Sequence, residues 1–193
     1  NQIYQGSSNV GGTSQIITFA SDYRNLIAVG TNMNIAGKKV AYITLGCKLN
    51  FSETSTIRHS LEKEGTETVA DKEGADIFVI NTCSVTDMAE KKGRQLIRKI
   101  IHHNPGAYIV VVGCYAQLRA KEIMAIDGVS LVLGAGEKFN VAHYLQHLEE
   151  QEKQEPHSCD IFKISNFDLA YSFGDRTRCF LKIQDGCDYF CIF

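Results

Sequence analysis

The chain has 193 residues, of which 44% are hydrophobic and 22% are charged, and its formal net charge at pH 7 is −2. This length accommodates one packed domain and the beginning of another. The balanced charge excludes a uniformly basic nucleic-acid-binding protein, so any contact with RNA has to come from a local patch. The apolar runs are too short to cross a bilayer and the first residues have no export-signal pattern, so we expect a cytoplasmic protein without a membrane partner.

The first part of the chain, residues 1–32, is rich in Ser, Gly, Asn and Thr. This composition predicts a poorly structured or non-native leader, with an extra edge strand or a short helix as the alternative. Both ends of the chain are expected to be cut from a longer sequence, because it begins at Asn1 rather than with a methionine and stops inside a cysteine motif.

Three short apolar runs dominate the next part of the sequence: residues 40–47, 77–83 and 108–114. Each is rich in β-branched residues, ends in a cysteine and precedes a helical pattern, which is typical of a buried parallel strand in a βαβ series. A further short strand is predicted at 131–133, and another is possible around 68–69. The pattern predicts an α/β fold: a doubly wound, Rossmann-like or flavodoxin-like, mostly parallel sheet with helices on both faces.

Four helices are expected between these strands. The first begins at Asn50 and ends at Gly65, with Asn50 and Glu53 as a capping-box-like start. The second, residues 86–103, has the clearest amphipathic pattern. The third and fourth are expected at about 116–126 and 138–150.

The second helix has a basic side. One face would bury its Leu and Ile residues, and the other would present Lys91, Arg94, Arg98 and His102. Clustered basic residues on one helix face are a candidate RNA contact. A solvated helix face is the favoured interpretation, because such patterns are common.

The domain organisation follows from these patterns. Residues 33–150 are predicted to form the α/β domain, and the charged stretch with Pro156 predicts a linker over 151–178. Residues 179–193 would then begin a second domain, with a strand over 179–184.

Seven cysteines, an odd number, favour metal or redox chemistry over structural disulfides in a chain without an export signal. Cys47, Cys83 and Cys114 each follow a predicted strand at its carboxyl end, the edge where ligands bind in doubly wound sheets. These three thiols are therefore predicted to hold a metal cluster. The alternative is that each cysteine is only a small buried apolar residue.

The end of the chain has a second thiol motif, Cys187 and Cys191, directly after a predicted strand and a glycine. One more cysteine would complete C-x-x-x-C-x-x-C, whose three thiolates can bind a four-iron cluster and leave one iron open to a ligand. Cys159 and Cys179 match no such motif and are interpreted as structural.

Four stretches of the sequence form a recognisable set: GCKLN at 46–50, NTCSVT at 81–86, GCYAQ at 113–117 and LKIQDGC at 181–187. On these stretches, the sequence from about Met33 to Phe193 resembles the amino-terminal part of the radical S-adenosylmethionine methylthiotransferases. Within this family, Lys48-Leu49 and Ser84-Val85-Thr86 are most similar to the branch that acts on threonylcarbamoyl-modified adenosine next to the tRNA anticodon.

The resemblance implies a role for each motif. Cys47, Cys83 and Cys114 would hold an auxiliary 4Fe-4S cluster that carries or delivers the inserted sulfur. Cys187 and Cys191 would help to hold the 4Fe-4S cluster that cleaves S-adenosylmethionine, and Phe193 would lie beside the adenine of that cofactor. The full-length protein would be an enzyme that needs a tRNA substrate and a reductant, whereas this chain alone is expected to be inactive.

Three alternatives remain open from the sequence. One is a methylthiotransferase that modifies a ribosomal protein, and another is a non-catalytic iron–sulfur or zinc-binding α/β module. The third is a flavodoxin-like or nucleotide-binding fold with incidental cysteines, which the absence of a complete phosphate-binding loop from the sequence makes the weakest.

Overall fold

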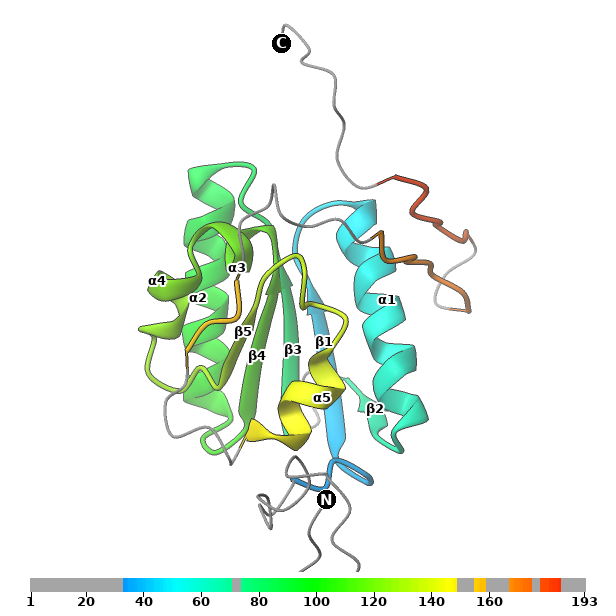
Figure 1. The fold of residues 1–193 in the computed structure, drawn as a ribbon. Coiled ribbons are helices and arrows are strands. Elements are labelled where there is room, and N and C mark those ends of the chain that lie inside the picture. The colour runs from blue at the N-terminus through cyan, green and yellow to red at the C-terminus, as the bar shows by residue number, and fades with distance from the viewer. Residues whose placement is uncertain (1–32, 71–73, 149–154, 159–166, 175–177, 185–193) are drawn as a thin grey trace, which may run out of the picture. The chain divides into compact units, whose positions relative to one another are not determined.

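The computed structural model describes residues 33–70, 74–148, 155–158, 167–174 and 178–184. Its centre is a five-stranded sheet in the order β2-β1-β3-β4-β5, and all neighbouring strands are parallel (Figure 1). The strands are β1 (Lys39–Thr44), β2 (Glu67–Val69), β3 (Ile77–Thr82), β4 (Tyr108–Gly113) and β5 (Leu131–Leu133). The predicted doubly wound α/β fold is confirmed, and its strand order is that of the flavodoxin-like type.

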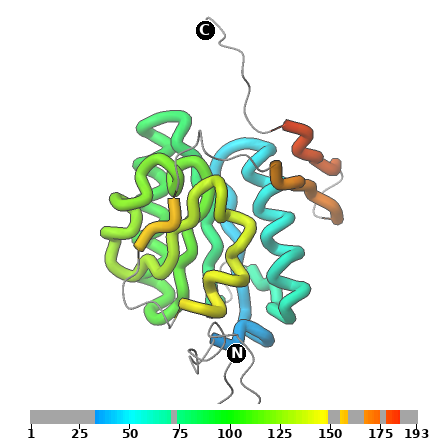
Figure 2. Tube along the Cα trace, in the orientation of Figure 1, coloured from blue at the N-terminus to red at the C-terminus, as the bar shows by residue number. Residues whose placement is uncertain are grey.

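Helices cover both faces of the sheet, as Figure 2 also shows. They are α1 (Lys48–Lys63), α2 (Asp87–His103), α3 (Cys114–Leu118), α4 (Ala120–Met124) and α5 (Val141–Gln146). One apolar core joins the sheet to α2, α3 and α4, and the other joins it to α1 and α5. The sheet is therefore the middle of three layers, which is why its central strands are mostly apolar.

Strand β3 shows how the sequence builds the two cores. Phe78 and Ile80 belong to the core on the α2 side, whereas Ile77 and Val79 belong to the core on the α1 side. All four are at most 1% exposed. Alternation of side chains along a strand sends neighbours to opposite faces, and each fully buried side chain of this size contributes about 1.5–3 kcal/mol.

Several expected element boundaries differ from the structure. The helix expected at 116–126 is two short helices, α3 and α4, that meet at Arg119, whose backbone leaves the helical region with φ −128° and ψ 36°. Helix α1 begins two residues before Asn50, so the predicted capping box at Asn50 and Glu53 is wrong. The stretch expected as a strand at 179–184 forms only an isolated antiparallel bridge, between Leu181 and Tyr171.

In the part of the chain that the structure describes, helices are too short or too polar to cross a membrane. The boundary predicted between the α/β domain and a linker at about residue 150 stays a prediction. Within that expected linker, residues 167–174 lie against α1, and Tyr171 hydrogen-bonds with Thr56 of this helix.

Candidate metal centre

The three predicted ligands follow three adjacent strands at one edge of the sheet. Cys47 is the residue before α1, Cys83 follows β3 directly, and Cys114 is the first residue of α3 after β4. The chain leaves β1 and β3 toward opposite sides of the sheet, so Cys47 and Cys83 flank the switch point where doubly wound folds bind ligands. All three thiols are free, with Cys47 and Cys114 exposed and Cys83 buried.

Two glycines allow the cysteine loops to approach each other closely. Gly46 has φ +112°, and a Cβ atom at this position would lie 2.8 Å from Cβ of Cys83. Gly113 has φ +100°, and a Cβ atom there would overlap Oδ1 of Asn81 and the carbonyl oxygen of Thr82. A side chain is unfavourable at positive φ and would also separate the strand ends, so both positions require glycine.

Beneath the cysteines, two buried amide side chains join α1 to β3. Asn50 is 2% exposed and Asn81 is fully buried. Nδ2 of Asn50 donates to Oδ1 of Asn81 (2.9 Å) and to the carbonyl oxygen of Thr82 (3.2 Å), and Nδ2 of Asn81 donates to the carbonyl oxygen of Asn50 (3.0 Å). The Cys47 thiol donates to Oδ1 of Asn50 (3.1 Å). This amide pair therefore fixes the first cysteine relative to the strand that leads to the second.

A buried ion pair lies near the third cysteine. Nζ of Lys138 is 2.6 Å from Oε1 of Glu53, and both side chains are less than 10% exposed. Cys114 is exposed as a residue, yet the surrounding protein desolvates its thiol and raises its pKa. The neighbouring thiol of Cys83, Glu53 and the thiol of Cys47 raise this pKa further, and Lys138 opposes them. The thiols of Cys47 and Cys83 thus lie close enough to Cys114 to act on it electrostatically.

Three cysteines are a donor set that iron–sulfur clusters use. Among the described residues, no three His, Cys, Asp or Glu side chains are arranged to hold one metal ion. A four-iron cluster is larger than an ion and each of its cysteine ligands binds a different iron, so the thiols need not converge on one point. Three free thiols at one edge match the three ligands that such a cluster with one open iron requires.

The remaining cysteines are placed only in part. Cys159, Cys187 and Cys191 lie outside the described residues, as does Phe193. Cys179 is free and solvent-exposed, so it does not pack as the small buried residue that the sequence suggested.

Large apolar side chains are exposed close in sequence to each cysteine of the candidate centre. Leu49 follows Cys47 by two residues and is 37% exposed; Val85 follows Cys83 by two residues and is 82% exposed. Leu118, in the helix that begins with Cys114, is 59% exposed. Exposed apolar groups beside a site are typical of a surface that contacts another domain or molecule. The sequence pattern does not predict that these three side chains are exposed. Leu49 and Val85 lie in cysteine motifs and Leu118 in an expected helix, and neither placement says which side chains face solvent.

The basic face of α2 is less available than the sequence suggested. Arg94 donates to the Tyr115 hydroxyl (2.8 Å) and pairs with Glu122 (2.9 Å). Lys91 and Arg98 are exposed. A contact between this face and RNA stays a prediction.

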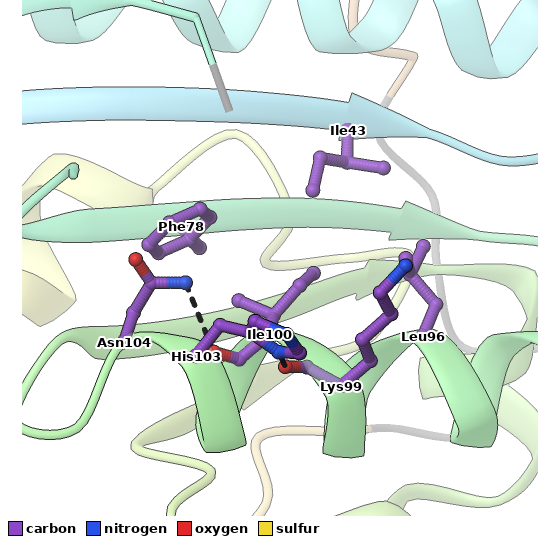
Figure 3. A pocket seen from close by; sticks show the side chains of 7 residues that line it. All are labelled: Ile43, Phe78, Leu96, Lys99, Ile100, His103 and Asn104. Carbon is purple, nitrogen blue, oxygen red and sulfur yellow. Dashed lines mark hydrogen bonds between the residues drawn. The ribbon is translucent and has the colours of Figure 1, made fainter. Parts of the chain in front are cut away.

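A groove of about 410 Å³ lies between α2 and the sheet, away from the candidate centre (Figure 3). Ile43 and Phe78 line it from the strands, and residues of α2 line the other side. Two of its polar side chains bond to the helix itself: Nδ1 of His103 to the carbonyl oxygen of Lys99 (2.7 Å) and Nδ2 of Asn104 to that of Ile100 (3.0 Å), while the Lys99 side chain also lines the groove. The groove therefore presents no cluster of reactive groups.

Comparisons with known proteins show what this chain is similar to. Residues 39–134 match the family described as uncharacterized protein family UPF0004. The chain is 42% identical over 156 residues to the threonylcarbamoyladenosine tRNA methylthiotransferase MtaB of Bacillus subtilis, which covers 80% of this chain and 35% of that protein. It is 36% identical over 158 residues to MtaB of Aquifex aeolicus, covering 80% of this chain and 38% of that protein.

The similarity extends to a methylthiotransferase with a different substrate. The chain is 31% identical over 172 residues to the ribosomal protein uS12 methylthiotransferase RimO of Prochlorococcus marinus, covering 84% of this chain and 36% of that protein. The chain spans a little over a third of the length of these curated relatives. The matched region contains β1 to β5 and all three cysteines of the candidate centre. Residues 39–134 of this chain therefore form a UPF0004 domain, and about 80% of the chain is similar to part of the methylthiotransferases.

Proposed function

We propose that this chain is the amino-terminal part of a radical S-adenosylmethionine enzyme that adds a methylthio group to threonylcarbamoyl-modified adenosine in tRNA. The observation that carries the proposal is the placement of three free thiols, Cys47, Cys83 and Cys114, after the carboxyl ends of three neighbouring strands of a UPF0004 domain. The protein would work in the cytoplasm, with tRNA as substrate and an electron donor as partner.

The residues have separate tasks in this proposal. Cys47, Cys83 and Cys114 would hold an auxiliary 4Fe-4S cluster, and Cys187 and Cys191, with a cysteine that follows this chain, would hold a second. When bound, the first cluster would supply sulfur and the second would cleave S-adenosylmethionine. Phe193 would lie beside the adenine of that cofactor.

The protein groups around the thiols support this function physically. The buried amide pair of Asn50 and Asn81 orients the Cys47 loop, and the close approach at Gly46 keeps it against Cys83. Buried hydrogen bonds that orient a ligand side chain are what a preorganised cluster site needs. The exposed apolar side chains Leu49, Val85 and Leu118 would exclude water once another part of the protein covers them.

The choice of tRNA as substrate rests on sequence similarity. Identity is 42% to the Bacillus subtilis tRNA enzyme and 31% to the uS12 enzyme named above. Modification of a ribosomal protein is the alternative, and a non-catalytic metal-binding module is a second one. We expect the 193-residue chain to bind the auxiliary cluster without completing the reaction.

Anaerobic reconstitution of the chain with iron and sulfide tests the cluster. We expect about four irons per chain. Cys47→Ala, Cys83→Ala and Cys114→Ala should each abolish stable binding, and Cys179→Ala, which removes an exposed thiol, is the matched control. Zinc in place of iron, or no metal in a folded chain, would favour the binding-module alternative.

The substrate is tested with a full-length protein that contains this chain. The protein is offered tRNA that carries threonylcarbamoyladenosine and, separately, ribosomal protein uS12, and the methylthio product is detected by mass spectrometry. Product on tRNA alone is expected. Product on uS12 alone would overturn the tRNA assignment while leaving the cluster chemistry intact.

A further inference from the structure

A buried ion pair joins the first helix to the loop that follows the last strand. Glu53 belongs to α1, Lys138 belongs to the loop between β5 and α5, and Nζ of Lys138 lies 2.6 Å from Oε1 of Glu53. The two side chains are 4% and 8% exposed. A buried pair of charges rarely stabilises a fold more than apolar side chains of the same volume would. Its position relative to the cysteines therefore decides what it can do.

The topology of the sheet places this pair over the strands that carry the second and third cysteines. Helices α1 and α5 pack on the same face of the sheet. Helix α1 follows β1 and the loop with Lys138 follows β5, so β3 and β4 lie between them and span about 14 Å. Glu53 and Lys138 can meet only over these two strands. Cys83 follows β3 directly, and Cys114 follows β4.

On α1, the carboxylate of the pair lies next to the residue that orients the first cysteine. Glu53 follows Asn50 by three residues, and side chains with this spacing are neighbours on a helix. Oδ1 of Asn50 accepts from the Cys47 thiol (3.1 Å), and its Nδ2 donates to Oδ1 of Asn81 at the end of β3 (2.9 Å). Glu53 is therefore within one helical turn of the buried amide pair beneath the cysteines.

The loop that carries the ammonium group is fastened to the helix that begins with the third cysteine. The N–H of Ala135 donates to Oε1 of Gln117 (2.7 Å), and Gln117 lies in α3, three residues after Cys114. The approach is close, because a Cβ atom on Gly134 would overlap the same oxygen. The loop is thus held against α3 at this point, and Lys138 lies three residues farther along it.

Both charges of the pair act on the third cysteine. Burial raises the pKa of the Cys114 thiol, and the neighbouring Cys83 thiol raises it further. Glu53 also raises this pKa, whereas Lys138 lowers it by a smaller amount. A charge that acts on a thiol also acts on a metal centre that this thiol binds, because both effects are Coulombic.

We propose that the buried pair tunes the reduction potential of the cluster that the three cysteines hold, with Glu53 lowering the potential and Lys138 raising it. The proposal rests on the proposed function, because it needs that cluster. Reduction adds negative charge to the cluster, which a nearby carboxylate opposes and a nearby ammonium group favours. Glu53 has the stronger effect at Cys114, so the pair as a whole should lower the potential. A lower potential would keep this cluster oxidised while an electron donor reduces the second one.

Redox titration of the reconstituted chain, followed by the EPR signal of the reduced cluster, tests the proposal. Parent and variants carry Cys187→Ser and Cys191→Ser, so that only the three-cysteine site can hold a four-iron cluster. Glu53→Gln should raise the equilibrium constant for reduction at least about 3-fold, which is about 28 mV at 59 mV per tenfold change. Lys138→Met should lower this constant. The double variant should lie between the two single variants and above the parent.

The variants are chosen to keep the fold and to separate charge from packing. In Glu53→Gln an amide oxygen can still accept from Lys138, and in Lys138→Met the Glu53 carboxylate still has Lys182, whose Nζ is 3.7 Å from its Oε1. Lys138→Arg keeps the positive charge. Lys63→Met changes an exposed lysine in the last turn of α1, about 15 Å of helical rise from Glu53. Both of these controls should keep the potential of the parent.

Opposite shifts in Glu53→Gln and Lys138→Met are a result that a structural role would not produce. Shifts of the same sign, unchanged potentials, or loss of the cluster from both variants would overturn the proposal and leave the pair with a structural role. A folded parent that binds no four-iron cluster would refute the proposed function, and the tuning role with it. A parent that binds the cluster and whose potential does not respond to either charge would refute the inference alone.

Discussion

The substitution Asn50→Asp tests whether the buried amide pair holds the candidate centre together. The two side chains have nearly the same shape, so the change removes one donor group and adds a charge without leaving a cavity. In the parent, Nδ2 of Asn50 donates to Oδ1 of Asn81 and to the carbonyl oxygen of Thr82. In the variant, a carboxylate oxygen would face these two acceptors at the same distances of 2.9 and 3.2 Å.

The size of the expected loss in the free energy of unfolding follows from the number of buried groups that lose a hydrogen-bond partner. Each buried polar group that is left unsatisfied costs about 1–3 kcal/mol, and two acceptors lose the same donor here. Rotation of the Asn81 amide would restore one bond but would break its bonds to the carbonyl oxygen of Asn50 and to Oγ1 of Thr54. We therefore expect the free energy of unfolding to fall by about 3 kcal/mol or more at pH 7.

Urea unfolding of the chain under reducing, anaerobic conditions measures this loss. Protonation of the new carboxyl group supplies a donor again, so the loss should shrink as the pH falls toward 5, because burial favours the neutral form. Asn34→Asp is the matched control: Asn34 is exposed and uses only its Oδ1, as acceptor from the N–H of Ala36 (3.0 Å), so its variant should lie within about 0.5 kcal/mol of the parent.

Two results would refute the reasoning. If Asn50→Asp unfolds within about 0.5 kcal/mol of the parent at pH 7, the amide pair does not hold α1 to β3. If the loss is large but iron binding on reconstitution is unchanged, the amide pair stabilises the fold without orienting Cys47.

Three further substitutions test other parts of the structure. Gly113→Ala should lower the free energy of unfolding in urea by about 3 kcal/mol or more, because the new side chain meets positive φ and overlaps the backbone. Gly37→Ala is the control: Gly37 has φ +77° and open space around it, so its variant should lose about 1–2 kcal/mol. Equal losses in the two variants would contradict the overlap at Gly113. Tyr42→Phe should reduce the loss of stability at alkaline pH. Burial raises the pKa of Tyr42 above its unfolded-state value. The stability that the neutral Tyr42 side chain contributes is therefore complete below the unfolded-state pKa of about 10 and is lost as the pH rises above it. Unfolding midpoints from pH 8 to 11 that run parallel in parent and variant would exclude this cause. Thr86→Ala should cost about 1 kcal/mol, because Oγ1 of Thr86 caps α2 by accepting from the N–H of Ala89 (3.1 Å), and Thr86→Ser should restore most of it.

The strands and their order of appearance were predictable because apolar periodicity is a local signal. Strands β3 and β4 are buried almost throughout and β1 is buried or half-buried after Lys39, and such apolar strands are recognisable without knowing what packs on them. The same pattern predicted α2 to within one residue, since its apolar and basic faces alternate with helical period.

The polar contacts at the site were not predictable, because their partners are distant in sequence. Asn50 and Glu53 fit a capping box locally, and this local explanation was wrong for both. The amide of Asn50 bonds to Asn81, 31 residues away, and the carboxylate of Glu53 pairs with Lys138, 85 residues away. Only a predicted strand order could have suggested that polar residues next to Cys47 and Cys83 face each other.

Strand order also decides whether three cysteines make one site. Strands β1, β3 and β4 are successive neighbours in the observed sheet. Because neighbouring strands lie about 4.8 Å apart, the ends of these three strands are close together. If β2 lay between β1 and β3, the same sequence pattern would place Cys47 about 5 Å farther from Cys83, beyond the reach of the contacts that Gly46 and Asn50 make. The connection through α1 instead carries β2 to the outer edge, and Cys47 remains beside Cys83. The three thiols therefore lie at one edge of the sheet, after neighbouring strands, because of the chain's path through the sheet, which the cysteine spacing alone does not specify.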